Sequence, residues 1–216
     1  MAKASPAGGS AGHPVPAPRR VPSVKRNRTQ YAPDKLEALA AQARHYAEHM
    51  MRTTGSVPAT LIADTEDGYI FCMPSALTDE TAKDHFAEVA RVFAVAHDAR
   101  ALVMIVEAWA RLPDANGHLD TEIPPSQAPD RREVVAVILE DARRCATGFI
   151  PILRDSAGAF EDFGEMPALE FGESAGRFSQ LMPRTKPSAR ERLEAAALLE
   201  KLGFDVANRG FDPNLN

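Results

Sequence analysis

The chain has 216 residues, of which 44% are apolar and 25% are charged, and it contains only two cysteines. This length suits one well-cored domain with extensions. The apolar runs fall short of the roughly 20 residues that a membrane-spanning helix needs, and two cysteines supply no disulfide framework. These totals argue against a membrane-spanning or disulfide-rich secreted protein and favour a cytoplasmic one.

Residues 1–30 differ from the rest of the chain in charge. They carry six cations and no acid, so the net charge of −5 divides into +6 here and −11 over residues 31–216. Five prolines and three glycines prevent a helix, and no apolar face or secretory signal is present, so we expect a disordered tail. Flexible cations bind nucleic-acid phosphates by counterion release; a solubilising tail, or one that folds back on the acidic body, is the alternative. The candidate cations are Arg19, Arg20, Lys25, Arg26 and Arg28.

The first ordered element is predicted to be a helix over residues 33–52. It contains His45-Tyr46-Ala47-Glu48-His49, which matches the H-x-x-E-H pattern and resembles the zinc site of inverzincin peptidases. On a helix the two histidines share a face, and the resemblance implies that Glu48 acts as the base for metal-bound water. The inverzincin pattern takes a third ligand, a glutamate, from a later helix, whereas the candidate here whose separation along the chain fits best, Glu122, falls in a Pro-rich loop. A metal-dependent hydrolase is therefore an alternative function, and two solvent-facing histidines are the simpler interpretation.

A hairpin and a second helix are predicted next. Two β-prone runs, residues 59–63 and 69–73, flank a turn that ends in Asp67-Gly68. Thr78 then suits the N-cap of a helix that reaches about residue 98. The helical spacing of its apolar residues predicts that this helix lies across a sheet. These apolar residues are Ala82, Phe86, Val89, Phe93 and Ala96.

The densest apolar run, residues 101–106, begins a predicted central strand over residues 101–110 that is covered on both faces over its first half. One face of the second half carries Glu107 and Trp109, the only tryptophan. A buried carboxylate at this place needs a cationic or hydrogen-bonding partner, because an unpaired buried charge is costly.

The Pro-rich loop 112–129 leads to a second apolar run, residues 133–140, which predicts the neighbouring strand. Long structured loops are often binding elements, and a disordered loop is the alternative. Arg131 and Arg132 are the expected partners of Glu107, either as an ion pair that pins the loop or as part of a binding site. The predicted binding residues are Glu107, Trp109, Asp130, Arg131, Arg132 and Glu140.

Three features of this region occur together. Glu107-Ala108-Trp109 ends an apolar strand, the pattern P-x-x-A-P-D-R-R-E follows from Pro125 to Glu133, and the next apolar strand ends in Glu140. This arrangement is similar to a type of uncharacterised protein found in bacteria and their phages or plasmids. The resemblance spans residues 55–160 and implies biological context but no activity.

Two shorter strands are predicted over residues 149–153 and 159–163, and Pro151 places the first at a sheet edge or a bulge. A capping box formed by Ser188 and Glu191 predicts a last helix over residues 189–202. Together these elements predict one α+β domain. It has a largely antiparallel five- to six-stranded sheet, one long helix packed on it, and flanking N- and C-terminal helices. The domain is expected to span residues 31–205 and to be followed by a frayed end over 206–216.

The sequence contains no phosphate-binding loop or dinucleotide fingerprint. Residues 172–176 match G-x-S-x-G but lack the strand and helix that a nucleophile elbow needs. We therefore predict no catalytic residue, cofactor or metal. The favoured function is a non-enzymatic binding or accessory protein whose sheet and Pro-rich loop recognise a partner protein. A small-molecule sensor pocket between the sheet and helix 78–98, reaching Glu107, is a further alternative.

Overall fold

The computed structural model describes residues 34–74, 76–111, 122–166, 169–172 and 176–204. Within these ranges the fold is α+β, with an antiparallel sheet, as the sequence predicts. The basic tail and the C-terminal end lie outside the described residues. The helices are α1 (Lys35–Thr54), α2 (Glu80–Ala96), η1 (Pro125–Gln127) and α3 (Ala189–Lys201). The strands are β1 (Thr60–Thr65), β2 (Gly68–Cys72), β3 (Ala101–Ala110), β4 (Arg132–Asp141), β5 (Cys145–Arg154), β6 (Phe160–Phe163) and β7 (Glu170–Gly172).

The sheet has the strand order β2-β1-β3-β4-β5-β6, and β7 also pairs with β5. Its centre is the β3–β4 ladder, which runs without a break from the pair Ala101 and Asp141 to the pair Ala110 and Arg132. From Pro151 the sequence predicted an edge strand or a bulge; β5 is an inner strand, and its pairing with β6 contains a register shift between Leu153 and Arg154. Pro151 is tolerated because it lies between the β5 residues that pair with β7 and those that pair with β6, where no ladder N–H is required.

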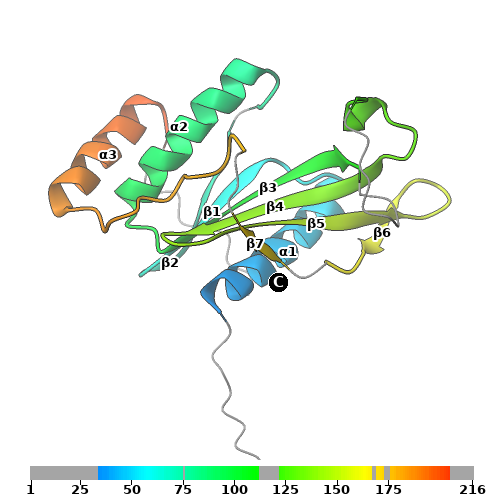
Figure 1. Ribbon diagram of the computed structural model, residues 1–216, viewed down its shortest axis with the longest axis horizontal. Coiled ribbons are helices and arrows are strands. Elements are labelled where there is room, and N and C mark those ends of the chain that lie inside the picture. Colours follow the sequence, from blue (N-terminus) through cyan, green and yellow to red (C-terminus); the bar gives the residue numbers. More distant parts are fainter. Residues whose placement is uncertain (1–33, 75, 112–121, 167–168, 173–175, 205–216) are drawn as a thin grey trace, which may run out of the picture. The chain divides into compact units, whose positions relative to one another are not determined.

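Helices cover both faces of the sheet, with α1 on one face and α2 and α3 on the other (Figure 1). Side chains alternate along β3, so Val103 and Ile105 pack toward α1 while Leu102 and Met104 pack toward α2. The prediction that the first half of β3 is covered on both faces is therefore confirmed. The same alternation decides on which face each residue of the candidate site lies.

The helix starts follow the predicted chemistry with one correction. Asp79, rather than Thr78, is the N-cap of α2, and its carboxylate accepts the N–H of Ala82 at 2.8 Å. An ionised carboxylate also interacts favourably with the positive end of the helix dipole, which a threonine hydroxyl does less well. The capping box of Ser188 and Glu191 at the start of α3 is confirmed. None of the described helices is both long and apolar enough to cross a membrane.

Candidate functional site

Trp109 and Arg131 meet at the end of the central strands. Trp109 extends from the α1 face of β3 and is 45% exposed. The guanidinium carbon of Arg131 lies 4.5 Å from the centre of the indole ring, within the range of a cation–π interaction. Arg131 also donates a hydrogen bond to the carbonyl oxygen of Ser126 in η1. The structure therefore brings together the predicted indole, one of the two predicted arginines and the Pro-rich loop.

Glu107 has a different partner from the one the sequence suggests. Its Oε2 accepts the backbone N–H of Val57 at 3.0 Å, just beyond the C-terminus of α1. The expected pairing with Arg131 or Arg132 is wrong for two reasons. Arg131 stacks on Trp109, and Arg132 is paired with Ala110 across the ladder, so its side chain leaves from the opposite face of the sheet.

Two further residues complete the site. Glu133 lies directly opposite Trp109 in the ladder, and Nε of Arg154 donates to its carboxylate at 2.6 Å, while Nη2 donates a second bond. The bond from Arg154 lowers the pKa of Glu133, an effect that partial burial opposes. Arg154 also interacts electrostatically with Glu107. We call the following set the strand-end cluster: Glu107, Trp109, Arg131, Glu133 and Arg154.

Sequence reasoning missed Glu133 and Arg154 for different reasons. Glu133 carries a usable signal, because it is two residues from the buried Val135 and must share its face. Arg154 reaches the cluster only because β5 pairs with β4, in a register that sets Pro151 opposite Val134. The spacing of residues along the chain does not reveal this pairing.

Asp130 closes the base of the Pro-rich loop instead of joining the strand-end cluster. Arg111, immediately after β3, donates to the Asp130 carboxylate from Nε at 2.9 Å and from Nη2 at 3.2 Å. The Arg111 side chain is only 12% exposed. This two-bond pair joins the two ends of the loop beside the strands that carry Trp109 and Arg131.

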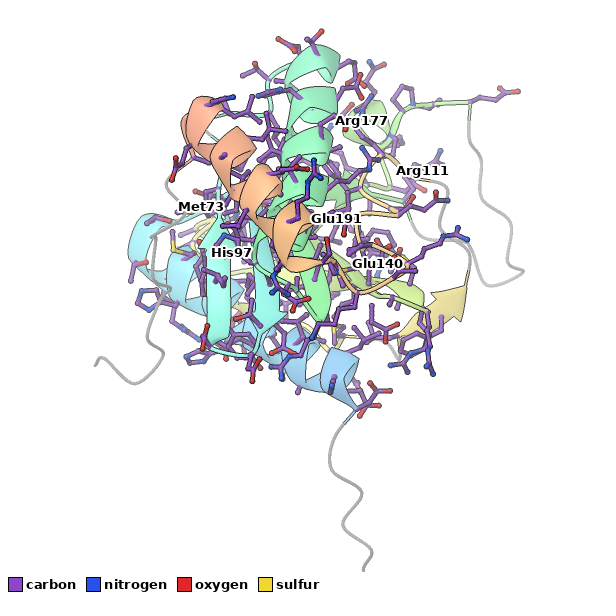
Figure 2. The ribbon with its side chains drawn as sticks, turned by 90° about the vertical axis from the view of Figure 1, so that its left-hand side faces the viewer. Met73, His97, Arg111, Glu140, Arg177 and Glu191 are labelled. Atoms are coloured by element: carbon purple, nitrogen blue, oxygen red, sulfur yellow. The ribbon has the colours of Figure 1, made fainter. Side chains whose placement is uncertain are left out.

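Glu140 lies apart from the cluster, at the opposite end of β4 and on the opposite face, beside the segment that leads into α3 (Figure 2). It is 8% exposed, and its two oxygens accept the backbone N–H groups of Leu181 and Met182 at 2.9 and 3.2 Å. Burial raises the pKa of this carboxyl, while the backbone donors act in the opposite direction. The structure therefore does not bring Glu140 together with Glu107 or Trp109.

The H-x-x-E-H segment lies in α1. His45 is exposed, and the Glu48 carboxylate accepts two hydrogen bonds from Arg52, at 3.0 and 2.8 Å. Among the described residues, no group of three or more His, Cys, Asp or Glu side chains is placed to hold a metal ion. The G-x-S-x-G segment falls partly outside the described residues.

The described part of the chain is thus an α+β protein with helices on both faces of an antiparallel sheet and an aromatic and arginine cluster at one end of it. Comparisons with protein-family models, with curated proteins and with solved structures find no match for this chain. Functional interpretation therefore starts from the geometry of the cluster.

Proposed function

We propose that this chain is a non-enzymatic binding protein that recognises a partner protein through the strand-end cluster and the adjoining Pro-rich loop. The observation that supports this function best is the exposed indole of Trp109 with Arg131 stacked on it. Tryptophan and arginine are the residue types that most often dominate the binding energy of protein interfaces. They are also enriched at interfaces relative to other protein surfaces.

The backbone around these two side chains supports the proposal. Trp109 stands on an inner strand of the sheet, and the pair of Arg111 and Asp130 joins the ends of the loop that Arg131 contacts. Side chains that are already held in place lose less conformational entropy when a partner binds. We therefore expect Trp109 and Arg131 to keep their positions when the partner binds.

The charges of the cluster indicate the chemistry of the partner. Arg154 forms an ion pair with Glu133, and Arg111 forms one with Asp130. Among the described residues, Arg131 contacts a ring and a carbonyl oxygen rather than a carboxylate. An arginine fork binds carboxylates with good geometry. We propose a partner surface that places an apolar or aromatic side chain on Trp109 and a carboxylate beside Arg131.

The test is capture of partners from a lysate, followed by measurement of the dissociation constant with the purified partner. Trp109→Ala should weaken binding about 30-fold or more, because loss of a hot-spot residue costs roughly 2–4 kcal/mol. Leu193→Ala is the matched control, since Leu193 is an apolar residue of α3 that is 73% exposed and outside the cluster. Equal binding by wild type and a folded Trp109→Ala variant would refute the assignment.

We also propose a cytoplasmic location and non-specific contact between the basic tail and nucleic acid. The location proposal is supported by the cysteine count, because two cysteines are too few for the disulfide framework of a small exported domain. The tail proposal is supported by its six cations and by the absence of acidic residues in positions 1–30.

A further inference from the structure

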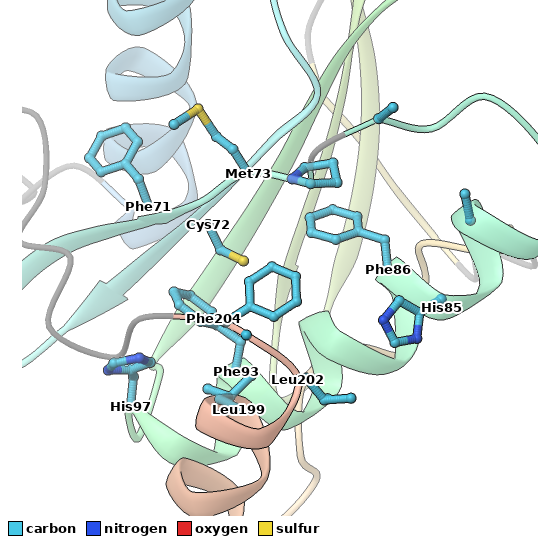
Figure 3. Close-up of a pocket in the computed structure, with 14 residues that line it drawn as sticks. Phe71, Cys72, Met73, His85, Phe86, Phe93, His97, Leu199, Leu202 and Phe204 are labelled. Carbon is cyan, nitrogen blue, oxygen red and sulfur yellow. The ribbon is translucent and has the colours of Figure 1, made fainter.

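A second candidate site lies on the other side of the sheet from Trp109. A cavity of about 520 Å³, partly open to solvent, is bordered by the end of β2, the inner face of α2 and the last turn of α3. Figure 3 shows Cys72, at the end of β2, facing Phe93 and Phe204 across this space, while the side chain of Met73 extends away from the two helices. Its volume is in the range of pockets that hold one small molecule, roughly 300–1,000 Å³. The sequence suggests, as an alternative function, a small-molecule sensor pocket between the sheet and α2 that reaches Glu107. This cavity lies between those elements, but Glu107 does not line it.

The walls of the cavity are mainly apolar. Aromatic rings of Phe86, Phe93 and Phe204 form much of the lining, and Leu199 of α3 is 1% exposed. No Asp, Glu, Lys or Arg is among the described residues that line it. The imidazoles of His85 and His97 are also part of the lining, but a charged group packed against the apolar walls would lose hydration without gaining a carboxylate, ammonium or guanidinium partner, so this lining favours a neutral ligand.

His97 supplies a polar group in this apolar setting. It is the C-cap residue of α2, lines the cavity and packs against Phe93, with ring centres 4.6 Å apart. Its Nε2 is buried and has no hydrogen-bond partner among the described residues. Burial lowers the pKa of His97, so the imidazole is neutral near pH 7. A buried polar atom without a partner costs free energy, which a ligand that bonds to it recovers.

The wall formed by α3 is weakly attached to the rest of the protein. Leu199 is the only buried residue within this helix, and Leu193 and Leu198 are exposed. At the start of α3, Arg192 pairs with Asp98 at 2.9 Å. An element with so little buried surface opens at low free-energy cost, and such an opening would expose the buried Nε2 of His97 to a ligand in the cavity.

We propose that this cavity binds a neutral, mainly apolar small molecule that carries one hydrogen-bonding group, such as a hydroxyl, directed to Nε2 of His97. This site is separate from the partner-binding surface, because the α2 and α1 faces of the sheet carry the two sites. The cavity proposal and the partner-binding proposal can therefore be refuted independently of each other.

The experiment uses the full chain and Nile red, a neutral fluorescent probe. Wild type should bind Nile red, and octan-1-ol should displace it at least tenfold better than octanoate, which has the same chain length but is charged. Ala82→Phe fills the cavity from α2 and should weaken Nile red binding at least tenfold. Ala76→Phe fills the cavity from the segment after β2, and it replaces Ala82→Phe in the test if that variant does not fold. Ala197→Phe, on the exposed side of α3, is the matched control and should bind as wild type does.

A second comparison tests the role of His97. His97→Leu should weaken competition by octan-1-ol roughly three- to tenfold, the effect of one lost hydrogen bond, and should leave Nile red binding within twofold. Unchanged Nile red binding in both cavity-filling variants, or equal displacement by octanoate, would overturn the proposal. Tighter Nile red binding after Phe211→Ser and Leu215→Ser would also overturn it, because the chain's own C-terminal segment would then be the occupant.

Discussion

Substitution of Glu140 by alanine should destabilise the fold more than any exposed glutamate substitution. The side chain is 8% exposed and accepts two backbone N–H groups of the segment before α3. Two buried N–H groups without acceptors cost roughly 1–3 kcal/mol each, and removal of the buried carboxylate offsets part of this cost. We expect a net loss of roughly 2–4 kcal/mol, or a fall of about 1–2 M in the urea midpoint.

The assay is urea unfolding followed by circular dichroism and by the fluorescence of Trp109. Glu88→Ala is the control, because Glu88 forms an exposed ion pair with Arg91 and its loss should cost less than about 1 kcal/mol. Glu140→Gln keeps one acceptor oxygen and should cost less than Glu140→Ala. An unchanged urea midpoint for Glu140→Ala would refute the view that this carboxylate anchors the segment.

The pH dependence gives an independent check on the same residue. Burial raises the pKa of Glu140 in the folded state above its usual value, so the folded state binds the proton more tightly than the unfolded state. The stability that this group contributes is present below the unfolded pKa of about 4.5 and is lost as pH rises through the folded pKa. The stability difference between wild type and Glu140→Gln should therefore shift against wild type as pH rises above about 4.5. A constant difference would contradict this direction.

Two further predictions concern the tail and the H-x-x-E-H segment. Replacement of the five clustered tail cations (Arg19, Arg20, Lys25, Arg26 and Arg28) by glutamine should weaken nucleic-acid binding and reduce the slope of log K against log salt by up to about 4, as measured by fluorescence anisotropy. An unchanged slope would show that the tail cations do not contact nucleic acid. Purified wild-type protein should lack stoichiometric zinc by elemental analysis. One equivalent of zinc that is lost in His49→Ala would contradict a purely binding function.

The sequence predicted those elements whose signals are local. β3 has the predicted bounds because its apolar run is long enough to define a strand that is covered on both faces. The β1–β2 hairpin and α3 follow from Gly68 and from the capping box of Ser188 with Glu191. In each case the deciding interactions lie within a few residues along the chain.

The misses depend on contacts between distant segments. β7 has three residues and exists because it pairs with residues 145–147 of β5, so no pattern of its own reveals it. β5 begins at Cys145, earlier than predicted, because the β4 ladder continues through the low-hydrophobicity residues Thr147 and Gly148. Glu107 accepts a hydrogen bond from the N–H of Val57, which is 50 residues away in the sequence. Only the packing of α1 on the sheet brings that N–H group into place.

The alternation of side chains along β3 has a consequence for insertions. A single residue added after Ile105 would turn every following side chain of the strand over, so that the indole of Trp109 would emerge beneath α2. The stacking with Arg131 and the hydrogen bond to Val57 would be lost together, and a bulky ring would enter the opposite layer. Each substitution proposed above alters the packing on one face of the sheet. This one-residue insertion would disrupt the packing on both faces.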